Sequence, residues 1–386
     1  MIEIKDKKMC CGCAACKQRC PQQCITLTED DEGFLYPHVD SDRCIDCKLC
    51  ERVCPFLQPR KGQKPLHVYA AMHKDEIIRM QSSSGGIFTL LSEHVIARGG
   101  VVFGVRFDEQ WEAVHDYTEK IEGLVAFRGS KYMQSRIGNA YEEVKQFLKE
   151  GREVLFSGTP CQVAGLKHFL GKRYEGLLTV DLVCHGVPSP KVWRKYLHGL
   201  KPQWTVANVQ FRDKRLGWKR FCVNIQLCSP TDKSDIITVS HPFHEDIFMR
   251  GFLSNLYLRP SCYECRAKKG KSGSDITIAD YWGIENVLPE RDDDKGMGLV
   301  FLNTEQGYKS FPHSLSLYTE TTYEDAVKYN GGINENIRTL HNRKRFFSEL
   351  DKQCDTERLI SEHLKVPLYK KVISRAKKMI LKYISV

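Results

Sequence analysis

The chain has 386 residues, of which 41% are apolar and 27% charged, a composition typical of a globular protein with room for two or three domains. No apolar run is long enough to cross a bilayer, and the opening segment MIEIKDKKMC has no apolar signal sequence, so we expect a cytoplasmic protein. The net charge is +10, but the sequence lacks the interleaved basic and aromatic residues of a nucleic-acid-binding surface, which argues against that class.

Two cysteine runs near the N-terminus share the pattern C-x2-C-x2-C-x3-C-P. This spacing is that of bacterial ferredoxins, which hold two 4Fe–4S clusters and in which the fourth cysteine of each run ligates the other cluster. The predicted ligands are Cys10, Cys13, Cys16 and Cys54 for one cluster, and Cys44, Cys47, Cys50 and Cys20 for the other. The alternative is a pair of zinc sites, because C-x2-C knuckles also bind zinc. Three tandem cysteines before x3-C-P favour iron and sulfur, and a disulfide framework is disfavoured in a chain that we expect to be intracellular.

These runs predict a ferredoxin-type domain over residues 1–57. The segment between them, ITLTEDDEGFLYPHVD, is typical of two short strands around a turn at Asp30–Gly33. Residues 58–66 are mostly polar and contain two prolines, which predicts a linker. We expect a second, larger domain over residues 67–340 and a helical, basic tail over residues 341–386.

The larger domain begins with alternating helices and strands. Helices are predicted at residues 86–98, 141–149 and 161–170, and strands at residues 100–107, 153–157 and 177–184. This alternation predicts a β-α-β unit with a largely parallel core. Further strands are predicted near residues 206–213, 220–228, 235–242, 275–283 and 299–303, as antiparallel additions to that core. The expected fold class is therefore α/β (α+β), with a small bacterial-type ferredoxin domain followed by a mixed-sheet domain.

Four further cysteines lie at positions that suit metal ligands. Cys161 opens a helix directly after a strand, behind the predicted N-cap Thr159, and a helix N-terminus favours the thiolate. Cys184 ends the next strand of the same β-α-β unit, so both thiols are expected at one edge of the sheet. Cys262 and Cys265 form a C-x2-C knuckle. The spacing leaves open a third 4Fe–4S cluster, a lone catalytic Cys161, and a Cys184 that is only a buried thiol.

The remaining cysteines are interpreted as structural. They are Cys11, Cys24, Cys222, Cys228 and Cys354. Cys11 and Cys24 flank the first cluster outside its spacing, whereas Cys222 and Cys228 share one face of a predicted strand.

Several motifs of the larger domain follow in an order that resembles a known family. They are SSSGGIFTLL at 82–91, GSKYMQS at 129–135, SGTPCQVAGLK at 157–167, LVCHGVPSP at 182–190 and CYECRAKKGKSGSDITIADYWG at 262–283. Over about residues 68–305 the chain resembles the beta subunit of the coenzyme F-420 hydrogenase/dehydrogenase family, in which fusion to an N-terminal ferredoxin module is known. The resemblance implies a flavin and iron–sulfur domain, with a 4Fe–4S cluster beside the isoalloxazine ring of FAD. It also implies that this cluster is held by Cys161, Cys184, Cys262 and Cys265.

The cofactor-binding residues are predicted to be Ser83, Ser84, Gly85, Gly86, Lys131, Tyr132 and Ser135. The first four open a helix whose free N–H groups suit the pyrophosphate of FAD, with glycines where the backbone must approach a ligand closely. The alternative is a plain serine N-cap. The last three offer basic, stacking and hydroxyl groups for a phosphate or a ring, with a solvated loop as the alternative. No G-x-G-x-x-G follows a strand, so a nicotinamide Rossmann site is not predicted.

A flavin exchanges two electrons as hydride, whereas clusters carry one electron at a time. Together they predict an oxidoreductase that passes electrons between a small-molecule hydride donor or acceptor at FAD and a one-electron protein partner. Relatives encoded near polysaccharide-synthesis genes suggest a tie to surface polysaccharide biosynthesis. One alternative is a non-enzymatic ferredoxin-like electron carrier or docking subunit without flavin, and another is a flavin-free reductase with Cys161 as nucleophile.

The C-terminal tail has apolar residues at helical spacing and basic residues on the other face. The apolar positions are Leu368, Val372, Ala376, Met379, Ile380 and Tyr383. This pattern is typical of a helix that lies on an acidic membrane surface, and it predicts peripheral contact with the inner face of the membrane. The alternative is a terminal helix that packs on the body of the protein.

Overall fold

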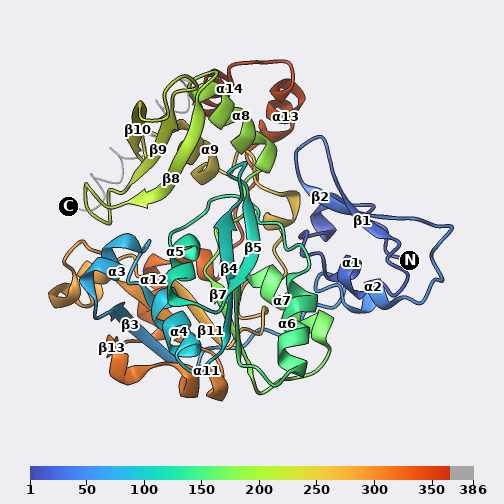
Figure 1. The fold of residues 1–386 in the computed structure, drawn as a ribbon, viewed down its shortest axis with the longest axis vertical. Helices are drawn as coiled ribbons and strands as arrows, with labels where there is room; N and C mark the ends of the chain where they lie inside the picture. Colours follow the sequence, from blue (N-terminus) through green and yellow to red (C-terminus); the bar gives the residue numbers. More distant parts are fainter. Residues whose placement is uncertain (366–386) are drawn as a thin grey trace, which may run out of the picture.

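The computed structural model of the chain describes residues 1–365 (Figure 1). The ferredoxin domain comes first, coloured blue in Figure 1, and each of its two cysteine runs contains a short helix, with a two-stranded hairpin between the two helices. These elements are α1 (Ala15–Arg19), β1 (Ile25–Glu29), β2 (Leu35–Val39) and α2 (Leu49–Arg52). Each helix begins after a residue in the left-handed conformation, Ala14 and Lys48, with φ of 61° and 60°. The repeat in the sequence is therefore also a repeat in backbone conformation.

The two strands of this domain form the expected antiparallel hairpin, with Ile25 opposite Val39 and Glu29 opposite Leu35. The Asp30 carboxylate closes its turn by accepting a hydrogen bond from the Phe34 N–H at 2.9 Å. Residues 58–66 contain no helix or strand and lead into the body.

The body is built on an eight-stranded mixed sheet with the order β13-β3-β12-β11-β7-β6-β4-β5. Its strands are β3 (His67–His73), β4 (Val101–Phe107), β5 (Ala113–Thr118), β6 (Val154–Gly158), β7 (Leu177–Leu182), β11 (Ile276–Asp280), β12 (Gly298–Leu302) and β13 (Ser316–Glu320). The four central strands β4, β6, β7 and β11 run parallel, and the other four are antiparallel to their neighbours. The parallel core and the mixed sheet confirm the predicted fold class.

Helices cover both faces of this sheet because its central strands are apolar on both sides. The bounds of the helices around the sheet are α3 (Glu76–Gln81), α4 (Ile87–Ile96), α5 (Leu124–Phe127), α6 (Ala140–Lys149), α7 (Pro160–Leu170), α10 (Ile284–Val287), α11 (Glu305–Ser310) and α12 (Tyr323–Tyr329). Along β4, Val101 and Phe103 pack in a core with α6 and α7, whereas Val102 packs in a second core with α4. This alternation is the period of a strand.

The ferredoxin domain shares the core of α6 and α7. Ala15 and Phe56 are buried together with Tyr141 of α6 and Val163 of α7. The Gln18 side-chain oxygen accepts hydrogen bonds from the N–H groups of Tyr141 and Glu142 at the start of α6. A helix N-terminus of the body is thus capped by the ferredoxin domain, and the two dock as one packed unit.

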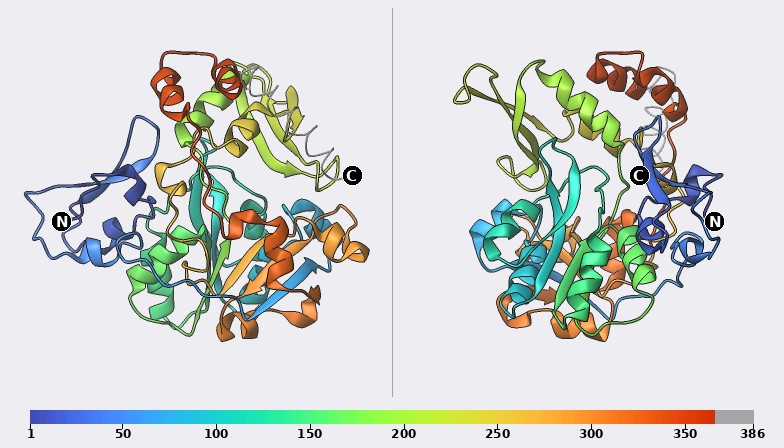
Figure 2. Two further views of the ribbon diagram at one scale, coloured as in Figure 1. Left: turned by 180° about the vertical axis from the view of Figure 1, so that it is seen from behind. Right: turned by 45° about the vertical axis from the view of Figure 1, so that its right-hand side comes forward.

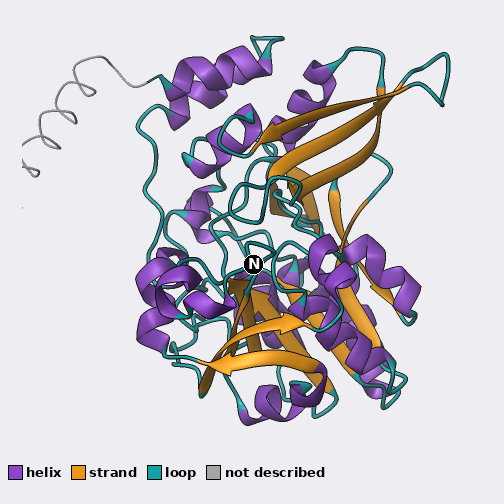
Figure 3. Cartoon of the chain, turned by 90° about the vertical axis from the view of Figure 1, so that its left-hand side faces the viewer, coloured by secondary structure: helices purple, strands orange, loops and turns teal. Residues whose placement is uncertain are grey.

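A second lobe carries its own three-stranded antiparallel sheet, in the order β10-β9-β8 (Figure 2). The strands are β8 (Thr205–Asp213), β9 (Cys222–Cys228) and β10 (Ile236–Pro242), and the helices are α8 (Pro190–Leu200), α9 (Ile247–Leu253), α13 (Arg343–Leu350) and α14 (Thr356–Leu364). These strands were expected as additions to the main sheet, but they pair only with one another, and α8 and α9 pack on the apolar face of the sheet that they form. Figure 3 shows this lobe above the main sheet.

The amphipathic tail predicted from Leu368 to Tyr383 lies outside the described residues. Within residues 1–365, no helix combines the length and apolar character needed to cross a bilayer.

Candidate metal centres and cofactor cavity

The first group of thiols joins the two cysteine runs. Burial raises the pKa of the Cys16 thiol well above its ordinary value, and three neighbouring thiols add to this rise. These neighbours are Cys13, Cys10 and Cys54. Burial likewise raises the pKa of Cys54 to about 11. The structure therefore brings Cys54 of the second run next to three cysteines of the first.

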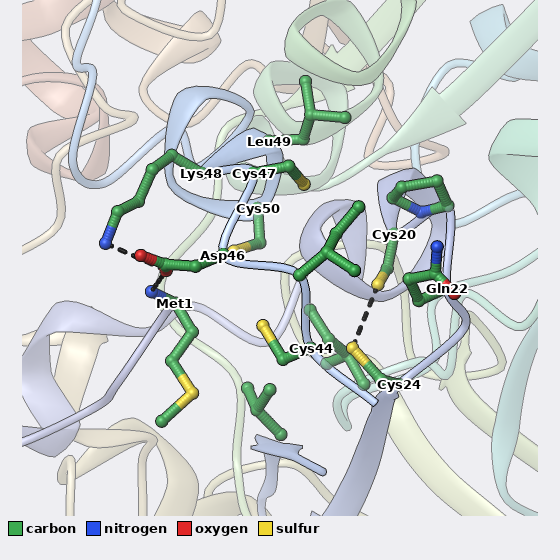
Figure 4. A pocket seen from close by; sticks show the side chains of 14 residues that line it. Met1, Cys20, Gln22, Cys24, Cys44, Asp46, Cys47, Lys48, Leu49 and Cys50 are labelled. Atoms are coloured by element: carbon green, nitrogen blue, oxygen red, sulfur yellow. Dashed lines mark hydrogen bonds and ion pairs between the residues drawn. The ribbon is translucent and has the colours of Figure 1, made fainter. Parts of the chain in front are cut away.

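The second group of thiols surrounds a small cavity of about 20 Å³ (Figure 4). Its lining includes the four predicted ligands Cys20, Cys44, Cys47 and Cys50. Apolar walls come from Ile25, Val39 and Leu49. Cys24 also lines this cavity, and its Sγ lies 3.4 Å from the Sγ of Cys20. The placement of Cys24 beside the first cluster was therefore wrong, because the chain carries it past Pro21 to the second group.

The third group contains the four cysteines of the body. Burial raises the pKa of the Cys184 thiol well above its ordinary value, with contributions from neighbouring thiols. These neighbours are Cys262, Cys161 and Cys265. Cys161 lies at the start of α7 behind the N-cap Thr159, whose Oγ1 is 3.2 Å from its Sγ. Cys184 follows β7, which is parallel to the β6 strand that leads into α7, so the two thiols meet at one edge of the sheet.

The first and third groups are neighbours across the domain junction. The Cys11 thiol lies between them, and its interaction with the Cys161 thiol lowers the pKa of Cys161 to about 7. The Cys11 thiol likewise lowers the pKa of Cys13, so its single S–H proton is shared between these two neighbours. Gly165 of α7 is in direct contact with Cys13, because a Cβ built on it would lie 2.9 Å from the Cys13 Sγ. Cys11, interpreted from sequence as structural, therefore joins a ligand of each group.

The second group lies further out. Met1 lines its cavity, and the N-terminus marks the outer edge of the molecule in Figures 1 and 2. The three groups therefore follow one another from the body to the periphery in the order third, first, second.

The predicted ligands of each group are four thiols. At the second group Cys24 adds a fifth thiol, and the Asp46 carboxylate, which also lines that cavity, is paired with the N-terminal ammonium and with Lys48. Among residues 1–365, no three or more His, Cys, Asp or Glu side chains surround a point suited to a single metal ion. Sets of four thiols match the ligand preference of 4Fe–4S clusters, in which each thiolate binds a different iron atom. All the cysteines are free thiols, so no predicted ligand is part of a disulfide.

A cleft of about 770 Å³ lies between the main sheet and the second lobe, within the size range of cofactor sites. The carboxyl edge of the four parallel strands forms its floor, through residues such as Val105, Gly158, Leu182 and Asp280. All the predicted cofactor-binding residues line it, namely Ser83, Ser84, Gly85, Gly86, Lys131, Tyr132 and Ser135. Cys184 also lines it. The cleft thus reaches the third group of thiols.

The serine and glycine segment of this cleft is fixed by the protein itself. The Ser83 Oγ accepts a hydrogen bond from the Ser130 N–H at 2.7 Å, and the Ser84 Oγ donates to the Met297 carbonyl at 2.6 Å. A Cβ on Gly85 would lie 2.5 Å from the Ala71 carbonyl oxygen, so this glycine allows the backbone to pack on the sheet. Gly86 has a φ of +82° at the start of α4. The expectation that these glycines serve the approach of a ligand was therefore incomplete, because sheet packing already requires Gly85.

Arg212 is a cleft residue that the sequence analysis missed. Its buried guanidinium makes two hydrogen bonds of 2.9 Å to the carboxylate of Asp280 and one of 3.2 Å to the Tyr132 hydroxyl. The Nε atom of Arg212 is buried without a hydrogen-bond partner among the described residues. A buried donor without a partner usually marks a missing ligand or water.

Lys131 and Ser135 lie on another wall of the cleft. The Lys131 ammonium donates to the carbonyls of Phe127, Arg128 and Gly129, and burial lowers its pKa to about 7. Ser135 contacts the Nδ1 of His115 at 3.1 Å. Burial lowers the pKa of His115 to about 4, so this imidazole is neutral at pH 7. The cleft therefore offers an ammonium, a guanidinium and hydroxyl groups to an anionic ligand.

Two family models match the chain. Residues 151–322 match the model for the C terminus of the coenzyme F420 hydrogenase/dehydrogenase beta subunit, and residues 9–57 match the 4Fe–4S dicluster domain. The first match contains the four cysteines of the third group, and the second contains the eight cysteines of the other two.

Curated relatives match about half of the chain. The coenzyme F420-dependent sulfite reductase of Methanocaldococcus jannaschii is 26% identical over 51% of this chain and 31% of its own length. A subunit of the F(420)H(2) dehydrogenase of Methanosarcina mazei is 24% identical over 50% of this chain and 59% of its own length. The chain thus spans less than two thirds of either relative.

A solved structure with a weaker likeness is a chain of the F420-reducing [NiFe] hydrogenase complex from Methanosarcina barkeri. It has 16% sequence identity and a TM-score of 0.44, over 72% of this chain and 97% of that one. On the two family models and the named relatives, residues 151–322 are similar to the C terminus of coenzyme F420 hydrogenase/dehydrogenase beta subunits, and residues 9–57 are similar to a 4Fe–4S dicluster domain.

Proposed function

We propose that the chain is an iron–sulfur flavoprotein oxidoreductase. It passes electrons between a small-molecule hydride donor or acceptor in the cleft and a one-electron protein partner at the ferredoxin domain. One observation carries this proposal: Cys184 belongs to the third thiol group and also lines the cleft, which is lined by every predicted FAD-binding residue. The thiols of Cys161 and Cys13, joined through Cys11, extend the same path into the ferredoxin domain.

The cleft suits an FAD by its size and its donors. The first N–H groups of α4 have no partner inside the helix and point to its N-terminus, where a pyrophosphate binds favourably. The unpartnered Nε of Arg212 and the ammonium of Lys131 add positive charge on two other walls. When bound, FAD supplies two-electron hydride exchange and the clusters supply one-electron exchange.

The residues around the cleft also exclude water and orient the ligand. Phe221, Phe243 and Phe252 of the second lobe give the cleft an apolar roof that excludes water from a bound ring. His115 is neutral and contacts Ser135, which lines the cleft. The Arg212–Asp280 pair holds the Tyr132 hydroxyl in place through its hydrogen bond. These groups bind and orient the ligand, while the thiols hold the clusters.

The one-electron partner is proposed to dock at the outer face of the ferredoxin domain. The second thiol group is closest to the periphery, and beside it the side chains of Met1 and Ile45 are 47% and 61% exposed. Exposed apolar residues around a redox centre favour brief contacts with another protein. The names of the relatives suggest a hydride donor of the deazaflavin type. A role in surface polysaccharide biosynthesis stays a prediction.

Anaerobic mixing of the purified chain with reduced donors tests the proposal. Reduced deazaflavin coenzyme, NADH and NADPH are compared. We expect one donor to bleach a bound flavin first and then to produce the electron paramagnetic resonance signal of reduced clusters. In Cys161→Ser the flavin should still bleach, but the ferredoxin clusters should stay oxidised. A chain that purifies with iron but never binds flavin would contradict the enzyme and support a simple electron carrier.

A further inference from the structure

Arg259 connects the first and third groups of thiols. It precedes the turn Pro260–Cys262, and its side chain is fully buried. Its guanidinium reaches into the ferredoxin domain, where it donates to the carbonyls of Cys10 at 2.8 Å and Leu35 at 2.9 Å. One terminal nitrogen is also 3.6 Å from the Cys10 Sγ. The side chain therefore starts beside a ligand of the third group and ends against a ligand of the first.

The charge of Arg259 has no carboxylate partner among the described residues. Its remaining hydrogen bond goes to the neutral side chain of Gln134, and its flat face lies 4.3 Å from the centre of the Tyr36 ring. The other buried arginines at comparable positions are paired, Arg212 with Asp280 and Arg343 with Glu32. An isolated buried cation is costly, so a negative group is expected beside it.

The thiols at both sites provide that negative group once they are deprotonated. The guanidinium lies 3.6 Å from the Cys10 Sγ of the first group, and the Arg259 carbonyl accepts a hydrogen bond of 2.9 Å from the Cys262 N–H of the third group. Arg259 is thus in contact with a ligand of each group. A cluster bound by four thiolates carries a net negative charge, which grows by one when it takes up an electron.

We propose that Arg259 is the counter-charge shared by the first and third clusters, and that it makes both easier to reduce than they would be without it. It is a positioning residue, because it acts through the charge that it places between the clusters. In each reduction the cluster gains one electron, and no bond to Arg259 forms or breaks. The inference rests on the cluster part of the proposed function and needs neither FAD nor turnover.

The test is a potentiometric titration of the full chain, reduced with dithionite in the presence of mediators and followed by electron paramagnetic resonance. Arg259→Met and Arg259→Gln remove the charge, whereas Arg259→Lys keeps it. A matched control is the double variant Arg343→Met/Glu32→Gln, which removes another buried arginine of the same domain junction together with its partner. Iron is counted in each variant.

In the two neutral variants, two of the three one-electron waves should move to a more negative potential by at least 59 mV. This shift corresponds to a tenfold change in the equilibrium constant of a one-electron reduction. The remaining wave, from the second cluster, should stay in place. Arg259→Lys and the control should move every wave by less than this amount. If the neutral variants lose iron that Arg259→Lys retains, the need for the charge is also supported.

Three results would overturn the proposal. The first is a set of fully loaded neutral variants with unmoved waves, and the second is movement of a single wave. The third is an Arg259→Lys variant that shifts, or loses iron, as much as Arg259→Met, since only the shape of the guanidinium would then matter. A chain without FAD or turnover would instead refute the proposed enzyme and leave these potentials measurable.

Discussion

Asp280→Asn is expected to destabilise the walls of the cleft. The carboxylate makes two hydrogen bonds of 2.9 Å to the guanidinium of Arg212, whose side chain is only 4% exposed. Asparagine keeps the shape of the side chain but leaves the charge of Arg212 buried without a counter-charge. Breaking a buried ion pair in this way costs about 3–5 kcal/mol. In contrast, Asp116→Asn breaks the half-exposed pair with Arg106 and should cost about 0–1 kcal/mol.

Urea denaturation followed by tryptophan fluorescence measures this difference. The probes are well placed, because Trp218 donates a hydrogen bond to Asp280 and stacks on Trp282 with ring centres 4.6 Å apart. With a slope of about 1–3 kcal/mol per molar urea, the midpoint for Asp280→Asn should fall by about 1 M or more. The double variant Arg212→Met/Asp280→Asn should recover part of this loss, since it removes the unpaired charge. The reasoning is refuted if Asp280→Asn shifts the midpoint no further than Asp116→Asn.

Three further variants probe individual contacts. The pKa of His115 is about 4 in the folded state and about 6.5 in the unfolded state, so the free energy of unfolding should fall by up to about 3 kcal/mol between pH 6.5 and pH 4. His115→Gln should make the urea midpoint depend less on pH. The same pH dependence in His115→Gln and in the unaltered chain would count against this assignment. Gly165→Ala would place a methyl group 2.9 Å from the Cys13 Sγ and should lower the iron content of the chain. Full iron loading with an unchanged absorption spectrum would contradict this contact. Cys20→Ser should keep the second cluster because Cys24 lies 3.4 Å away, and Cys20→Ser/Cys24→Ser should lose it; equal iron in both variants would exclude this substitution of ligands.

Local patterns in the sequence were sufficient to predict the parts of the fold that depend on local interactions. The β-α-β unit around Cys161 was predicted because its apolar strands and the helix signal at Thr159 lie within a few residues of one another. The hairpin around Asp30–Gly33 followed from its turn residues in the same way. The cysteine spacing also led to the assignment of Cys54 to the first group, where the structure places it.

Contacts between distant residues outside the cysteine motifs could not be predicted. Arg259 meets Cys10 across 249 positions, and Arg212 meets Asp280 across 68. A single arginine leaves no periodic signal, and its burial becomes evident only when the domains are packed together. The strands β8, β9 and β10 were recognised individually, but the sequence of a strand does not show which other strand it pairs with, so their separation into a second sheet was not predicted.

A path through three clusters and a flavin is tested most directly by the iron and flavin content of the anaerobically purified chain. We expect about twelve iron atoms, four for each cubane, and one FAD per chain. Cys161→Ser should lower the iron to about eight, because only the third group loses a ligand. Iron near eight in the unaltered chain would contradict the third cluster, and zinc in place of iron would contradict the whole account.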